Sequence, residues 1–175
     1  MTPSDAPATD QTRRRAGWWG GAVLVLVALV WRLPYAVTRG FHEADELWYA
    51  LPTVARLLKG EWLFYISGTN YGAPVQEFLA SLLFRAFGES ALTLRLPVVV
   101  LGVLGVLVAY LALRTVVRAR AAFGMSLLLA CAGSSVAHYT TFAHPCYAAT
   151  FLLVGALQLL TFRLDRARTS RKVAA

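Results

Sequence analysis

The sequence predicts an all-α membrane protein with four transmembrane helices and, in the first outer loop, two amphipathic helices at the membrane interface. Three observations support this prediction. Of the 175 residues, 58% are hydrophobic and only 15% are charged, which is outside the usage of soluble domains. The apolar residues form long blocks separated by short polar segments. Most basic residues gather in alternate segments between these blocks.

Four blocks have the length and composition of membrane spans, which need roughly 17 or more residues with almost no charge. They cover residues 17–37, 96–113, 121–137 and 146–162. The first block contains Arg32 near its end, and we expect this guanidinium to snorkel toward the headgroups. Gly102, Gly105 and Gln158 lie inside the later blocks, where small and polar residues are typical of helix contacts. The chain thus divides into a tail, 1–15, and a membrane domain, 16–175.

The distribution of basic residues predicts the orientation of the spans. Eleven basic residues lie in the N-terminal tail, the second loop and the C-terminal segment, beside only three acidic residues. The other six basic residues are balanced by six acidic ones. The positive-inside rule therefore predicts cytoplasmic termini and an outer loop at 38–93. Arginine-rich composition favours a bacterial plasma membrane. We expect membrane lipid, and no nucleic acid, to meet the basic segments.

The outer loop is too apolar to be a free linker. Leu47, Leu51, Val54 and Leu58 recur at helical spacing before Gly60, which predicts an amphipathic helix with Asp45 as its N-cap. The turn-forming run S-G-T-N-Y-G-A-P follows at 67–74. A second amphipathic helix is predicted from there to Gly88 by apolar residues at the same spacing, namely Phe78, Leu79, Leu82, Leu83 and Phe87.

The acidic residues of the outer loop cluster at its start. The stretch Phe41–Tyr49 reads F-H-E-A-D-E-L-W-Y and contains Glu43, Asp45 and Glu46. Two interpretations stay open: a solvated helix start, or a general base at the membrane surface. A charged carboxylate must avoid hydrocarbon. We therefore expect Asp45 to face a polar cavity close to the 139–147 loop.

The outer loop and the second span together resemble part of a known family. An acidic pair opens an interfacial helix, a second such helix follows, and G-E-S-A-L-T-L-R-L-P at Gly88–Pro97 leads into the second span. This arrangement resembles the N-terminal part of the GT-C fold membrane glycosyltransferases, in particular the protein O-mannosyltransferase and lipid A aminoarabinose transferase family. The resemblance covers Arg32 to Arg114.

The resemblance implies a glycosyltransferase that moves a sugar from a polyprenyl-phosphate donor to an acceptor at the outer face. Asp45 matches the family's base, and Glu46 would support it. The leaving phosphate needs a cation or a metal nearby. Candidates for binding the donor and its sugar are Arg56, Lys59, Arg85, Arg95 and Tyr71.

Departures from the family keep other hypotheses open. Trp48 and Ala73 stand where many relatives have basic residues, and full-length members are much longer. The chain is thus either an enzyme, a truncated non-catalytic relative, or one half of a split enzyme. In the last case a membrane partner would supply the missing helices.

A divalent metal is a candidate cofactor, although no motif in the sequence identifies a particular metal. His42, His138 and His144 all fall at the outer ends of predicted spans, on the same side as Glu43. Imidazole and carboxylate are normal ligands of such a metal. The alternative is that these histidines are simply exposed at the interface.

Overall fold

The computed structural model describes residues 10–37, 40–41, 43–131, 133–144 and 146–174. Within these residues the fold is entirely helical, as the sequence predicts, and no strand forms. The helices in chain order are α1 (Asp10–Ala36), the π-helical turn η2 (Glu46–Ala50), α2 (Leu51–Leu58), α3 (Val75–Phe87), α4 (Ala91–Val116), α5 (Ala119–Ala130), α6 (Ser134–Tyr139) and α7 (Tyr147–Ala174).

Three helices are long and apolar enough to cross a membrane. They are Trp18–Ala36 within α1, Ala91–Val116 of α4 and Tyr147–Ala167 within α7. Three of the predicted spans are therefore present as helices. Ser90 begins α4 through a reciprocal capping box with Thr93, which satisfies free backbone donors at the helix start.

The predicted span 121–137 is not one continuous helix. α5 ends at Ala130, and α6 begins at Ser134. The 12 residues of α5 extend about 18 Å at about 1.5 Å per residue, which is less than the roughly 30 Å of a hydrocarbon core. The prediction of a single third span was wrong because the chain turns within its second half.

Arg32 stabilises this turn. The expectation that its guanidinium extends to the headgroups was wrong. Its side chain is fully buried. Nη1 donates to the Ala130 carbonyl at 3.0 Å, at the last turn of α5, and Nε donates to Thr140 Oγ1 at 3.0 Å. A helix end leaves its last carbonyls without intrahelical partners, so Arg32 supplies one of the missing donors.

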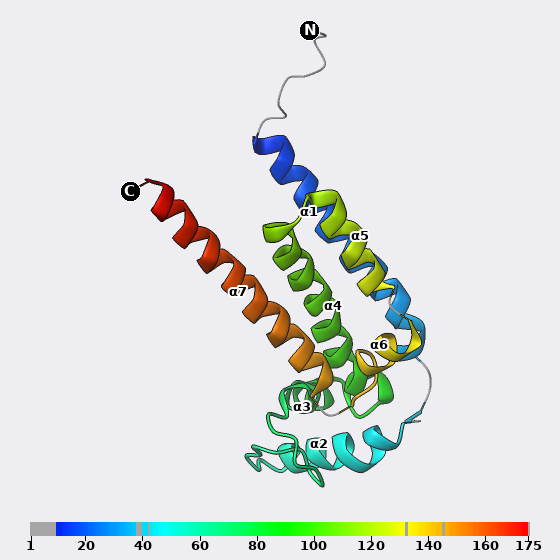
Figure 1. The fold of residues 1–175 in the computed structure, drawn as a ribbon. Coiled ribbons are helices and arrows are strands. Elements are labelled where there is room, and N and C mark those ends of the chain that lie inside the picture. Colours follow the sequence, from blue (N-terminus) through cyan, green and yellow to red (C-terminus); the bar gives the residue numbers. More distant parts are fainter. Residues whose placement is uncertain (1–9, 38–39, 42, 132, 145, 175) are drawn as a thin grey trace.

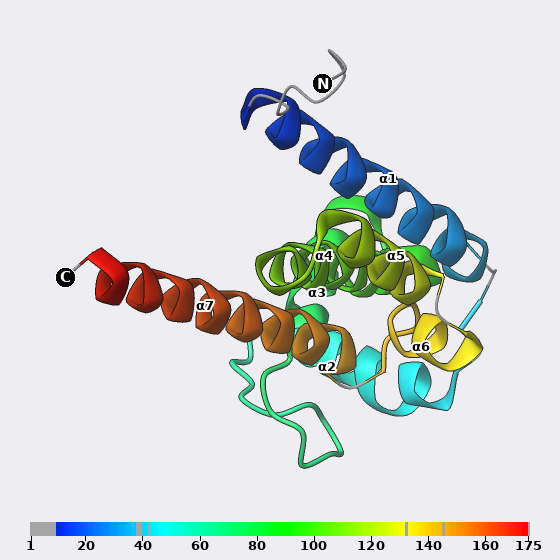
Figure 2. The ribbon, with the colours of Figure 1, turned by 45° about the horizontal axis from the view of Figure 1, so that its top comes forward.

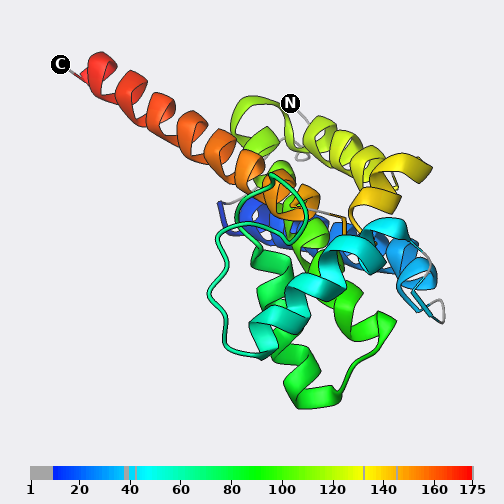
Figure 3. The same ribbon diagram turned by 90° about the horizontal axis from the view of Figure 1, so that it is seen from below.

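The long helices run along one direction, and the short ones gather at one end. α4 lies at the centre and contacts α1, α3, α5 and α7. α2 and α3 lie across the lower end in Figure 1, and the view from below in Figure 3 shows them beneath α4. The start of α1 and the end of α7 both lie at the opposite end.

Small residues allow α4 to approach its neighbours closely. A Cβ added to Gly105 would overlap the Phe151 ring of α7, and one added to Gly102 would lie 2.9 Å from Thr140. The predicted contact role of these two glycines is confirmed. Gln158 differs, because it lies on the exposed side of α7.

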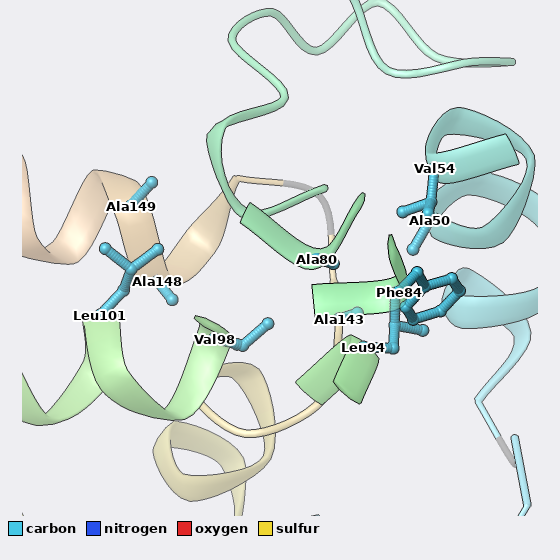
Figure 4. Packing of buried hydrophobic residues seen from close by; sticks show 10 residues of the cluster. All are labelled: Ala50, Val54, Ala80, Phe84, Leu94, Val98, Leu101, Ala143, Ala148 and Ala149. Atoms are coloured by element: carbon cyan, nitrogen blue, oxygen red, sulfur yellow. The ribbon is translucent and has the colours of Figure 1, made fainter. Parts of the chain in front are cut away.

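One apolar cluster joins the outer-loop helices to the long helices (Figure 4). Its members come from η2, α2, α3, α4, the connection between α6 and α7, and the start of α7, and they are Ala50, Val54, Ala80, Phe84, Leu94, Val98, Leu101, Ala143, Ala148 and Ala149. Packed interiors have low compressibility, so one element of such a cluster cannot move without displacing the others. The cluster therefore fixes the position of the segment that contains Asp45.

The two helices predicted in the outer loop are present, and the orientation of α3 is informative. Its exposed side includes Phe78, Leu82 and Phe87, whereas Gln76 and Glu77 are buried against the protein. Ala80 and Phe84 are buried as well, so α3 has apolar residues on both sides, unlike a helix in water, whose outward face is polar. The predicted N-cap role of Asp45 was wrong: the residue has helical dihedral angles and makes no capping hydrogen bond.

Candidate functional site

Asp45 and His144 meet at the outer-loop end of the molecule. Asp45 Oδ2 lies 2.7 Å from His144 Nδ1. Asp45 comes from the first helical turn after α1, and His144 comes from the connection between α6 and α7. The expectation that Asp45 lies beside the 139–147 loop is confirmed. Because an ionised carboxylate can only accept, Nδ1–H is the donor, and a neutral ring then has its lone pair on Nε2.

Asp45 forms part of the wall of an open pocket of about 540 Å³. The pocket combines three phenol rings with polar loop groups, and its lining is Asp45, Tyr49, Gly68, Thr69, Asn70, Tyr71 and Tyr147. Tyrosine rings offer an apolar face and a hydroxyl, which suits a sugar with both C–H and O–H surfaces. Tyr71, predicted to bind substrate, thus lies in the same pocket as Asp45.

Backbone hydrogen bonds shape the loop that forms one wall. Ile66 N donates to the Tyr71 carbonyl at 2.9 Å, and an isolated bridge joins Tyr65 to Gly72. Gly68 has a φ of +78°, which disfavours side chains, and lies against the Tyr49 ring. Figure 2 shows the loop projecting from α2 and α3 on the side of α7.

Thr53 anchors this loop to α2. Its fully buried hydroxyl accepts a hydrogen bond from Ser67 N at 2.8 Å and donates to the Tyr49 carbonyl at 2.7 Å. This role was not predicted, because a threonine in a helix is usually solvated or bonded to its own turn. Thr53 therefore fixes the distance between two walls of the pocket.

Glu46 and Arg95 form a buried ion pair next to the pocket. Arg95 Nε and Nη2 donate to the two Glu46 carboxylate oxygens, each at 2.7 Å, and both side chains are fully buried. Arg95 also donates to the Gly40 carbonyl and lies over the Phe142 ring. Neither residue lines the Asp45 pocket. In this arrangement the two groups neutralise each other and join η2 to α4.

The remaining basic candidates lie outside the pocket. Arg56 pairs with Glu61 at 2.6 Å and contacts Ser67, which precedes the pocket residues. Arg85 Nη2 contacts the Leu58 carbonyl at 3.4 Å, and Lys59 is exposed just after α2. None of these three residues lines the pocket that contains Asp45.

Three of the four predicted metal ligands lie together. Glu43, His138 and His144 each offer one ligand atom, and these atoms all lie within 4.8 Å of one another. His42, the fourth predicted ligand, lies outside the described residues.

Gln76 of α3 contacts the His144 backbone and also Glu77, and neither Gln76 nor Glu77 was predicted to be part of the site. Gln76 Nε2 donates to the His144 carbonyl and to Glu77 Oε1. Burial of Glu77 raises the pKa of its carboxyl from 4.5 to about 7. The available signal was two adjacent polar residues at the start of an otherwise apolar helix.

No family model, curated protein or solved structure matches the chain. Its function is therefore inferred from the side chains that meet around Asp45.

Proposed function

We propose that the chain is a GT-C-like glycosyltransferase that moves a sugar from a polyprenyl-phosphate donor to an acceptor. Asp45 acts as the general base. One observation supports this proposal above the others: the Asp45 carboxylate is held by the buried His144 at the wall of a pocket lined by tyrosines. The resemblance of residues Arg32 to Arg114 to that family agrees with this chemistry.

The reaction uses the carboxylate oxygen that His144 leaves free. Oδ2 accepts from the ring, and Oδ1 takes the proton from the acceptor hydroxyl as its oxygen attacks the anomeric carbon. The bond from that carbon to the donor oxygen breaks, and the polyprenyl phosphate leaves with the electron pair. A positioned general base contributes roughly 10²- to 10⁴-fold to the rate. Tyr49, Tyr71 and Tyr147 would stack on the sugar.

The proposed location is the outer face of a bacterial plasma membrane, with cytoplasmic termini. The start of α1 and the end of α7 lie away from the pocket, and basic residues are frequent at both. The outward apolar side of α3 suits contact with lipid at the interface. α5 and α6 together would form the crossing between α4 and α7, and Arg32 donates to the Ala130 carbonyl at the end of α5.

Cysteine labelling tests this orientation. In a background without Cys131 and Cys146, we expect Lys59→Cys to react with an impermeant thiol reagent in intact cells. Ala119→Cys, at the exposed start of α5, should react only after lysis. Labelling of Ala119→Cys from outside would overturn the orientation.

Sugar transfer tests the role of Asp45. Membranes containing the chain are incubated with radiolabelled polyprenyl-phosphate sugars, and transfer to lipid and protein acceptors is counted. Asp45→Asn should lower transfer by about 10²-fold or more without changing membrane insertion. Glu89→Gln is the matched control, since Glu89 is an exposed acid outside the Asp45 pocket. Undiminished transfer by Asp45→Asn would reject the proposal.

A second candidate function is binding of a partner membrane protein. Gln158 is exposed in the middle of the apolar part of α7, among the exposed Leu153, Val154 and Leu157. An amide in hydrocarbon lacks hydrogen-bond partners, whereas a neighbouring transmembrane helix can supply one. α7 would then bind a helix of the partner that completes the enzyme.

Site-specific photo-crosslinking at Leu157 tests this second candidate. A protein adduct that disappears in Gln158→Leu would support a partner helix, and the exposed Leu160→Ala serves as the control. Adducts with lipid alone would reject it.

A further inference from the structure

We infer that Glu43, His138 and His144 form a binding site for a divalent transition metal of the zinc type. His138 Nε2 lies 3.6 Å from Glu43 Oε2, and one ligand atom from each of the three residues lies within 4.8 Å of the others. Two imidazoles and one carboxylate are a known zinc ligand set that leaves a fourth position open. Imidazole ligands favour Zn²⁺ and other late first-row transition metals over Mg²⁺, which prefers oxygen ligands.

The state of His144 supports this assignment independently. The residue is only 6% exposed, and its Nε2 has no hydrogen-bond partner in the described part of the chain. Leaving such a buried polar atom without a partner is unfavourable, because the atom has lost its hydrogen bonds to water. A metal ion would satisfy it, because a neutral ring that donates from Nδ1 presents its lone pair at Nε2.

Asp45 completes the arrangement expected around a metal-bound histidine. Ligating histidines usually donate their other ring N–H to a carboxylate, which fixes the tautomer and makes the ligating nitrogen more basic. His144 Nδ1 lies 2.7 Å from Asp45 Oδ2, so this second contact is already in place. Asp45 is therefore a positioning residue for the metal, in addition to its proposed role as base.

Small side-chain movements would close the site. Zinc–nitrogen distances of about 2.0–2.1 Å place tetrahedral ligands about 3.3 Å apart. The Glu43 and His138 atoms are already near that separation at 3.6 Å. The widest separation of 4.8 Å needs a shift of about 1.5 Å. Glu43 and His138 are 30% and 35% exposed, so their side chains are less enclosed than that of the buried His144.

Metal titration of the purified chain in detergent tests the site. After EDTA treatment and its removal, Zn²⁺ is titrated in competition with a chromophoric zinc indicator. We expect one Zn²⁺ per chain. Glu43→Gln and His138→Ala should each weaken binding by roughly 100-fold or more, and Asp45→Ala by about 10- to 100-fold. Glu89→Gln, an exposed acid away from the site, should bind zinc as the unmodified chain does.

Glu43 and His138 are only partly buried, so substituting them should not unfold the chain. Helix content by circular dichroism and elution in gel filtration must match those of the unmodified chain. Absence of zinc binding, unchanged binding by Glu43→Gln and His138→Ala together, or displacement of Zn²⁺ by equimolar Mg²⁺ would each overturn the inference. Binding is read without a sugar donor. Zinc binding without transfer would count against the proposed function alone, and transfer without zinc binding against the metal site alone.

Discussion

Arg95→Met tests whether the Glu46–Arg95 pair is a structural element or part of a substrate site. The substitution removes both donors that lie 2.7 Å from the Glu46 carboxylate oxygens. Only Ala143 N, at 3.4 Å, then remains near Oε1 among the described contacts. Removing one partner of a buried ion pair costs about 3–5 kcal/mol, because the other charge stays buried without compensation.

Thermal unfolding in detergent, followed by circular dichroism, measures this cost. For a chain of this size 1 kcal/mol corresponds to about 2–4 °C, so Arg95→Met should lower Tm by roughly 6–20 °C. The double variant Glu46→Leu with Arg95→Met removes both charges. It should recover most of the loss, because an apolar replacement of a buried ion pair is often neutral.

Arg85→Met is the matched control. It makes the same chemical change at an exposed arginine of α3, where surface substitutions usually alter stability by less than about 0.5 kcal/mol. If Arg95→Met melts like this control, the pair is not structural and Arg95 becomes a candidate for the donor phosphate. If the double variant is as unstable as Arg95→Met alone, the cost comes from the lost contacts with Gly40 and Phe142 instead.

Three further changes test the fold and the loop. The pKa of Glu77 is raised from 4.5 to about 7, so the folded chain binds an extra proton between these two pH values. The free energy of unfolding should therefore fall by up to about 3 kcal/mol as the pH rises from 4.5 to 7. Thermal melts of Glu77→Gln from pH 4 to 8 should lack this pH dependence. Gly105→Ala should lower Tm by overlap with Phe151, whereas Gly124→Ala, with open space around its Cα, should not. Thr53→Val should speed proteolysis of the 61–74 loop without loss of helix content, because Ser67 N loses its acceptor; equal cleavage rates would contradict this role.

The strongest sequence signals gave the most reliable predictions. The apolar runs of α1, α4 and α7 and the periodic residues of α2 and α3 appear as helices, because burial or lipid contact along a whole helix outweighs local preferences. The third predicted span failed for a tertiary reason. Its turn after Ala130 depends on a hydrogen bond from Arg32, which is 98 positions away in the chain. Hydropathy cannot report such a contact.

The candidate site was only partly predictable, for a similar reason. The sequence identified the acidic stretch, the nearby histidines and Tyr71, because unusual residue types at the end of an apolar span are visible without a structure. Which of these residues meet depends on how the α6–α7 connection folds back. His144 contacts a residue 99 positions earlier, and Thr53 contacts the loop through a hydrogen bond typical of no motif.

The division of roles between Asp45 and Glu46 follows from their adjacency on a helical turn. Successive residues of a helix point about 100° apart, so two neighbouring carboxylates cannot both face the same pocket. Glu46 points to Arg95 of α4 and is fully buried, whereas Asp45 points to His144 and the pocket, with its side chain 33% exposed. Fixing Glu46 through two hydrogen bonds also fixes the backbone of Asp45, one residue away. The ion pair would therefore help catalysis without contacting substrate: Arg95→Met should lower transfer through the position of Asp45, in proportion to its effect on Tm, while Asp45→Asn should lower transfer with Tm unchanged.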